Sequence, residues 1–301
     1  MASMKQETAG MEQERFEAGR RSTVVSVIVN IGLTTVQIIA GIFSGSQALI
    51  ADGVHSLSDL ISDFVVLFAA HHSRKQADAD HQYGHQRYEN AASLAIGGIL
   101  LAVGIGMLWS AFHKIADPSS VQQVHVLALW VALAALVSKE LLFRYMLGVA
   151  QRVRSSMLAA NAWHARSDAA SSLVVALGII GNLSGLPVLD PIAALIVGLM
   201  VSRMGGSFFW RALNDLMDRA VSEEELTAIR STLLQTPGVF GIHDLRTRKM
   251  GDMTIVDVHL EIDGSQTVTQ GHAIAVNARQ RVLDQHRVLD VMTHVDPVQP
   301  G

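Results

Sequence analysis

The chain has 301 residues, of which half are hydrophobic and 17% are charged, and its mean hydropathy of +0.31 is too high for a soluble domain of this length, which indicates a membrane protein. The net charge of −4, without a concentrated basic face, argues against a nucleic-acid partner. Cysteine is absent, which excludes disulfides and thiolate ligands, so a metal site would have to use carboxylates and some of the 13 histidines.

Six segments are long and apolar enough to cross a lipid bilayer as helices, which takes about 20 residues each. The first 20 residues are polar and lack the apolar core of a cleavable signal peptide. Lysine and arginine are concentrated in alternate connections, so the positive-inside rule predicts that both termini are cytoplasmic. The expected spans lie within a transmembrane domain at 21–212, after a polar segment at 1–20, and cover residues 22–44, 47–71, 90–114, 121–147, 155–183 and 187–207.

The second span carries a stripe of ionisable residues. His55, Asp59 and Asp63 repeat at every fourth position and Asp52 lies one turn earlier, so a helix points all four the same way. A charge at the bilayer centre costs roughly 2.5–3.5 kcal/mol, so such residues usually line a water-filled path or a binding site. A helix-end role or an internal polar contact is the alternative for a single carboxylate such as Asp52.

The fifth span repeats this spacing with His164 and Asp168. Two helices that each offer one imidazole and one carboxylate on one turn can supply the four tetrahedral ligands that Zn²⁺ adopts. Two neutral histidines and two ionised aspartates also balance the charge of a divalent ion, which lowers its desolvation penalty. The residues therefore predict an intramembrane metal site made of His55, Asp59, His164 and Asp168.

Residues 213–301 have the composition of a small soluble domain. Ser222 and Glu225 have capping-box spacing and open a helix. Residues 253–263 alternate between apolar and polar side chains, which predicts a strand with one solvated face. With a strand at 239–249, a helix at 268–285 and a strand at 287–296, the order is αββαβ. A module of about 80 residues forms only a small core, so dimerisation would help to stabilise it.

From about residue 20 to 298 the chain resembles the cation diffusion facilitator family, and the two His-x-x-x-Asp motifs carry the resemblance. It implies a homodimeric metal–proton antiporter of the cytoplasmic (inner) membrane, with six transmembrane helices and a cytoplasmic ferredoxin-like domain. In that family the His-Asp/His-Asp ligand set goes with Zn²⁺. Bacterial zinc/iron members often have aspartate where this chain has His55, so Fe²⁺, Cd²⁺ or Mn²⁺ as the main substrate stays an alternative.

The resemblance implies two further metal sites and one ion pair. Loop and sheet histidines are often merely solvated, although His294 and Asp296 share one strand face. Arg87 and Asp218 match a charge interlock at the dimer centre. The implied ligands are Asp78, His81 and His85 in the loop after the second span, and His243, His259, His272, His294 and Asp296 in a structural or regulatory binuclear Zn²⁺ site.

Two other functions are alternatives to transport. An intramembrane metallohydrolase needs an open coordination position and a carboxylate base, as in His-Glu-x-x-His, and the sequence lacks this motif. A closed set of four ligands favours carrying an ion over catalysis, so no enzyme activity is expected. A metal-responsive scaffold or sensor, in which the soluble module does the work, stays open. The expected function is Zn²⁺ efflux from the cytoplasm, driven by protons that move inward.

Overall fold

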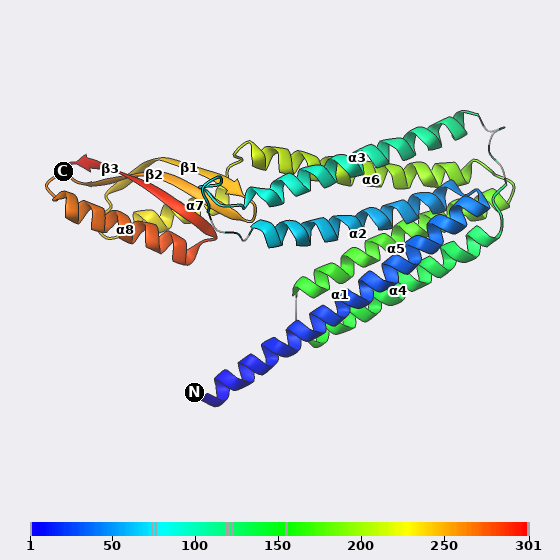
Figure 1. The fold of residues 1–301 in the computed structure, drawn as a ribbon, viewed down its shortest axis with the longest axis horizontal. Helices are drawn as coiled ribbons and strands as arrows, with labels where there is room; N and C mark the ends of the chain where they lie inside the picture. Colours follow the sequence, from blue (N-terminus) through cyan, green and yellow to red (C-terminus); the bar gives the residue numbers. More distant parts are fainter. Residues whose placement is uncertain are drawn as a thin grey trace. The chain divides into compact units, whose positions relative to one another are not determined.

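The computed structural model describes residues 2–299 apart from 74, 76, 118, 120, 122, 154 and 155; the side chains of residues 2–20, 63, 66, 67, 70, 71, 156, 157 and 160 lie outside the description. The chain divides into two compact units (Figure 1). The first comprises Met1–Phe64 and Gly98–Gly206, and the second comprises Val65–Gly97 and Ser207–Gly301.

Six long helices form where the sequence predicts membrane spans. Among the described residues, three segments are long and apolar enough to cross a membrane: Arg21–Ser44, Arg87–Ala116 and Leu189–Leu216. The other three helices carry ionisable residues that lower their hydropathy, among them Asp52, Lys139 and Asp168. The six helices are α1 (Ala2–Ser44), α2 (Gln47–Ser73), α3 (Arg87–Ala116), α4 (Leu127–Arg152), α5 (Ser156–Leu183) and α6 (Leu189–Leu216).

The bounds of three helices differ from the expected ones. The polar segment at 1–20 continues into α1 without a break, α4 begins at Leu127 instead of residue 121, and α6 continues to Leu216. Hydropathy marks where a segment is apolar, whereas a helix continues as long as its backbone hydrogen bonds do. Polar turns added to an apolar helix are therefore invisible to a hydropathy criterion.

Small residues allow the helices of the first unit to pack closely. A Cβ at Gly205 of α6 would meet the backbone of Leu101, and one at Gly104 of α3 would meet Ser202, so α3 and α6 lie side by side with their backbones close (Figure 1). Such small-residue contacts are how helices associate in lipid, where no hydrophobic effect draws them together. The buried core of this unit includes many alanines, from Ala40 in α1 to Ala194 in α6.

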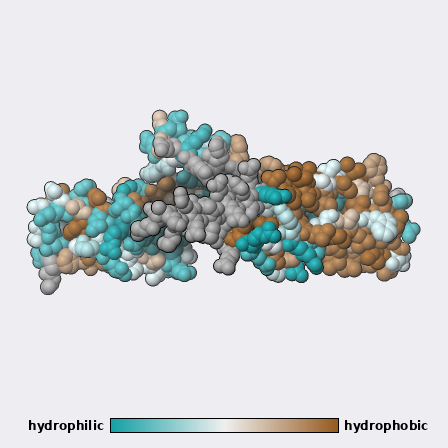
Figure 2. All heavy atoms as spheres, turned by 90° about the horizontal axis from the view of Figure 1, so that it is seen from below, coloured by the Kyte–Doolittle hydropathy of each residue, from teal (hydrophilic) through white to brown (hydrophobic). Residues whose placement is uncertain are grey.

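The outer surface of the helices is apolar. Figure 2 shows hydrophobic residues over much of the visible face of the helical part, whereas hydrophilic residues dominate the visible face of the C-terminal module. Large side chains stand exposed on the helices, including Ile28, Phe43 and Trp130. An exposed apolar surface of this kind is stable in lipid and would be a liability in water.

The second unit confirms the predicted αββαβ order. Ser222 accepts a hydrogen bond from the Glu225 backbone and so caps α7, and Thr267 forms a capping box with Gln270 at the start of α8. The elements are α7 (Glu223–Leu234), β1 (Gly241–Met250), β2 (Met253–Asp263), α8 (Val268–Gln285) and β3 (Val288–Val298).

The three-stranded sheet has the order β1-β2-β3, with β1 antiparallel and β3 parallel to β2. Val258 and Leu260 of β2 are buried in one core with Ile229 of α7 and Ala278 of α8. The alternate residues of β2, including His259, are only partly buried. One face of the sheet is thus covered by helices, and the other face carries the polar side chains.

The close approach of α3 and α6 gives a test of this packing. We expect Gly205→Val to lower the stability of the protein by about 1–3 kcal/mol, because the new side chain must displace the backbone of Leu101. The matched control is Gly106→Val in α3, where an added Cβ has no neighbour within 4 Å. Thermal unfolding in detergent measures both variants, and equal melting temperatures would contradict the packing.

Candidate metal centres

The first cluster lies between α2 and α5 in the helical unit. Side-chain ligand atoms of His55, Asp59 and Asp168 lie within 4.8 Å of one another. The helical repeat places His55 and Asp59 on the same face of α2, with Nδ1 of His55 at 3.6 Å from Oδ2 of Asp59. The structure therefore brings three of the four expected ligands to one point.

His164, the fourth expected ligand, lies outside this group among the described side chains. It is exposed and lines a cavity of about 60 Å³ together with Asp59 and Asp168. Asn30 of α1 and Asn161 of α5 line the same cavity. The imidazole of His164 thus lines the same cavity as the carboxylates of Asp59 and Asp168, but it is not part of the close group of ligand atoms.

The donor set of this cluster fits a divalent cation. Within the described part of the chain, Nδ1 of the buried His55 has no hydrogen-bond partner. The hydroxyl of Ser56 in the next position is likewise buried without one. A buried polar atom without a partner costs free energy, and an ion bound by His55, Asp59 and Asp168 would remove this cost at the imidazole, using ligand types that suit Zn²⁺.

Asp52 does not join the metal ligands. Its carboxylate is fully buried and both oxygens lie 3.3 Å from Nζ of Lys139 in α4. Gln37 and Ser172 also donate hydrogen bonds to Asp52. Lys139 was not among the residues predicted from the sequence, although a lysine inside an apolar span is itself a signal of a polar partner.

Arg166 is a further ionisable residue of the helical unit, on α5. Its guanidinium lies over the rings of Phe143 and Trp163, at 4.9 and 5.2 Å from their centroids. An arginine can be stabilised by aromatic faces in this way. The side chain of Asp63 lies outside the described residues.

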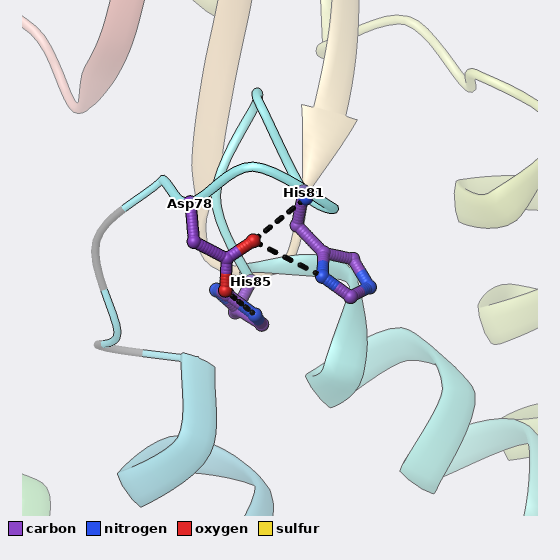
Figure 3. Close-up of side chains that lie close together, drawn as sticks. All are labelled: Asp78, His81 and His85. Carbon is purple, nitrogen blue, oxygen red and sulfur yellow. Dashed lines mark hydrogen bonds and ion pairs between the residues drawn. The ribbon is translucent and has the colours of Figure 1, made fainter.

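The second cluster is formed by the loop between α2 and α3. Oδ1 of Asp78 accepts a hydrogen bond from the His81 backbone at 2.7 Å and lies 3.5 Å from the His81 ring, while Oδ2 lies 3.4 Å from Nε2 of His85 (Figure 3). The backbone N–H of His81 lowers the pKa of the Asp78 carboxyl. All three expected loop ligands therefore face one another, and the carboxylate is held in its ionised form.

The third cluster lies on the open face of the sheet. His243, His259 and His294 are cross-strand neighbours on three adjacent strands, and the Asp296 carboxylate lies 3.1, 2.8 and 3.3 Å from their ring nitrogens, respectively. The hydrogen bond from His259 lowers the pKa of Asp296. The ligand atoms of His243, His259 and Asp296 lie within 4.8 Å of one another, and His294 contacts the same carboxylate through its other oxygen, so four of the five expected ligands are neighbours of a type that suits Zn²⁺.

The fifth expected ligand of the sheet site, His272, lies apart from the group that contains His243, His259 and Asp296. It is on α8 and lines a different cavity, of about 400 Å³, together with Gln266 and Pro297. The helix α8, which precedes β3 in the chain, packs on the covered face of the sheet. Within one chain, His272 is therefore separate from the histidine residues on the open face.

Arg87 and Asp218, expected to form an ion pair, are in direct contact through Nη2 and Oδ1. Asp218 has a positive φ of 59° just beyond the end of α6. Aspartate tolerates this left-handed conformation better than most residues other than glycine. The pair links the start of α3 to the segment that follows α6.

Comparison with known proteins finds two family models along the chain. The model described as the cation efflux transmembrane domain matches residues 23–217, and the model described as the cation efflux protein, cytoplasmic domain, matches residues 221–298.

Three similar proteins come from a plant and two bacteria. Metal tolerance protein C1 of Arabidopsis thaliana is 33% identical over 300 residues, which cover 95% of this chain and 64% of that protein. Magnetosome protein MamB of Magnetospira sp. strain QH-2 is 32% identical over 274 residues, covering 90% of this chain and 92% of that protein. Manganese efflux system protein MneS of Bacillus subtilis strain 168 is 28% identical over 286 residues, covering 95% and 98%.

The geometry of the sheet cluster can be tested by removing its shared carboxylate. We expect Asp296→Asn to weaken metal binding at this cluster by at least about tenfold, because the amide loses the charge that three imidazoles share. Cobalt absorption bands, titrated in the full-length protein, measure the loss. The matched control is Asp290→Asn on the same strand, whose carboxylate binds Arg279 instead. Equal cobalt affinity in the two variants would show that the cluster is not a metal site.

Proposed function

We propose that this chain, which belongs to the cation efflux family, exports a divalent metal ion across a membrane and that Zn²⁺ is the ion it carries. The observation that carries the proposal is the group formed by the buried His55 and the half-buried Asp59 and Asp168 inside the helical unit. Family membership makes the chain a transporter and not an enzyme. His164 would complete the set of four ligands from its position on the wall of the neighbouring cavity.

Coupling to protons follows from the ligand chemistry. Imidazole and carboxylate bind metal only when deprotonated, and histidine titrates near neutral pH, so protons and metal compete for one set of atoms. Metal would bind from the cytoplasm, and protons would replace it after its release on the other side. Alternating access then requires that helices around the site rock between two arrangements.

The choice of metal rests on the donor set. Two imidazoles and two carboxylates in a tetrahedron suit Zn²⁺. The relatives include a protein named for manganese efflux and a protein of the magnetosome, so Mn²⁺ and Fe²⁺, together with Cd²⁺, are the alternative substrates. Affinity for divalent ions alone does not separate these metals, because geometry and ligand type decide the selectivity.

The proposed assembly has six spans with both termini in the cytoplasm, in the cytoplasmic (inner) membrane. We also propose that two copies form a dimer through the domain at 213–301, with Arg87 and Asp218 near its centre. The loop cluster and the sheet cluster would hold Zn²⁺ in a structural or regulatory role. Metal bound there would stabilise the folded dimer by mass action. A metal-responsive scaffold is the second candidate function, and the two exposed clusters favour it.

Asp59 offers the most direct test of transport. In proteoliposomes with an imposed pH gradient, we expect Asp59→Ala to abolish zinc uptake, because the ion loses a ligand and half of its compensating negative charge. The matched control is Glu140→Gln, which removes a carboxylate that binds Arg144 on α4 and should leave uptake unchanged. Zinc uptake at the wild-type rate by Asp59→Ala would refute the ligand assignment. A wild-type protein that binds metal without any flux would favour the scaffold.

His55 offers a test of substrate choice. We expect His55→Asp to raise transport of Fe²⁺ or Mn²⁺ relative to Zn²⁺, because a site with more oxygen donors is harder and less suited to zinc. Parallel uptake of the four metals by the wild type and the variant measures the ratio. An unchanged ratio would mean that His55 does not set the selectivity.

A further inference from the structure

A buried network of polar side chains joins four helices next to the metal ligands. Nζ of Lys139 in α4 bonds both oxygens of Asp52 in α2 and lies 2.8 Å from the hydroxyl of Ser172 in α5. Gln37 of α1 donates to the same carboxylate, and Asp52 and Lys139 are 0% and 3% exposed. Lys139 also reaches the backbone carbonyl of Asp168 at 3.5 Å, so the network is tied to a metal ligand.

The network lies to one side of the metal ligands on α2 and α5, the two helices that carry both. Asp52 precedes His55 on α2, whereas Ser172 follows Asp168 on α5. With the proposed cytoplasmic N-terminus, even-numbered helices run inward and odd-numbered helices run outward. The network of Asp52 and Lys139 is therefore on the outer side of the metal site.

The two sides of the site differ in polarity. On the inner side, the cavity that reaches Asp59 and Asp168 is lined by polar residues of α1 and α5, including Ser26, Asn30 and Asn161. On the outer side, beyond the network, lies a core of buried apolar residues, including Ala40, Ala48, Ala132, Val175 and Ile179. An ion can approach from the inner side, and the network is the first barrier that it meets on the way out.

We propose that the Asp52–Lys139 pair closes the outer side of the metal site and that Lys139 is a positioning residue of the transport cycle, acting through Asp52 and the backbone of Asp168. This inference deepens the proposed function and rests on it. A buried pair with complete hydrogen bonding holds one arrangement, while removal of one partner leaves an uncompensated charge that attracts water. Opening toward the outside then requires that α2 and α4 separate at this pair.

The test measures access from the outer side. The chain has no cysteine, so a single cysteine placed at Val175, one turn beyond Ser171, reports the opening of the outer core. A membrane-impermeant maleimide is added to the outer side of sealed vesicles without metal. We expect slow labelling of the Val175→Cys protein itself and labelling on the order of tenfold faster after Lys139→Met, because a sparsely populated open state becomes common.

Two further variants separate closure from general damage. The exchange of charges, Asp52→Lys with Lys139→Asp, should return labelling to the slow rate, because the pair is restored in reverse. Arg144→Met removes a basic residue from the same helix, where it binds Glu140 at the surface, and should leave labelling slow. Monodisperse elution in detergent shows that each variant is folded.

Each outcome decides the proposal. Slow labelling of the Lys139→Met protein would overturn the proposal. Fast labelling of the folded charge-exchange protein would also overturn it, because closure by the ion pair would be restored by the exchange, whereas a local packing role would not. Should Lys139→Met fail to fold, the charge-exchange protein decides alone, with slow labelling in support. Zinc flux is measured separately: a wild type that carries no metal refutes the proposed function, while the labelling still reports whether the pair closes the outer side.

Discussion

The free energy of burying charge in an apolar helix bundle governs this structure. A charged side chain removed from water must find a partner, bind an ion or lose its charge. Asp52 finds an internal partner in Lys139 and needs no ligand. His55, Asp59 and Asp168 bring together two carboxyl groups and an imidazole nitrogen without a hydrogen bond, a set that the proposed divalent cation would complete. The same physical cost therefore accounts for one cluster as a fixed support and for the other as the proposed binding site.

The loop and sheet clusters of the second unit contain the same residue types, histidine and aspartate, but the free energy of burying their charges is smaller. Asp78 and Asp296 stand near the surface, and each is surrounded by imidazoles held in place by a turn or by strand register. Hydrogen bonds from the surrounding histidine residues lower the pKa of both carboxyls, which favours the ionised form that a metal ligand needs. Contact with water suits the structural or regulatory role that we propose for these clusters more than the transport of an ion through lipid.

Much of this architecture could be predicted because its signals are local. The helices follow from hydropathy, the αββαβ module from capping and strand alternation, and the transmembrane cluster from histidine and aspartate at helical spacing, whereas the loop and sheet clusters were implied by the family resemblance. One contact between distant residues was missed: Asp52 and Lys139 are 87 residues apart, and nothing in either segment specifies the other. The aromatic partners of Arg166 and the separate position of His272 likewise depend on how helices pack, which periodicity does not determine.

The central claim is that α2 and α5 hold one divalent ion between them. X-ray absorption of zinc-loaded protein in which Asp78 and Asp296 are replaced by alanine would examine the helical site without the two surface clusters. If His55, Asp59, His164 and Asp168 bind the ion, the spectrum will show four nitrogen and oxygen ligands at about 2.0–2.2 Å, with imidazole scattering. Zinc surrounded by water oxygens alone, or no retained zinc, would contradict the assignment.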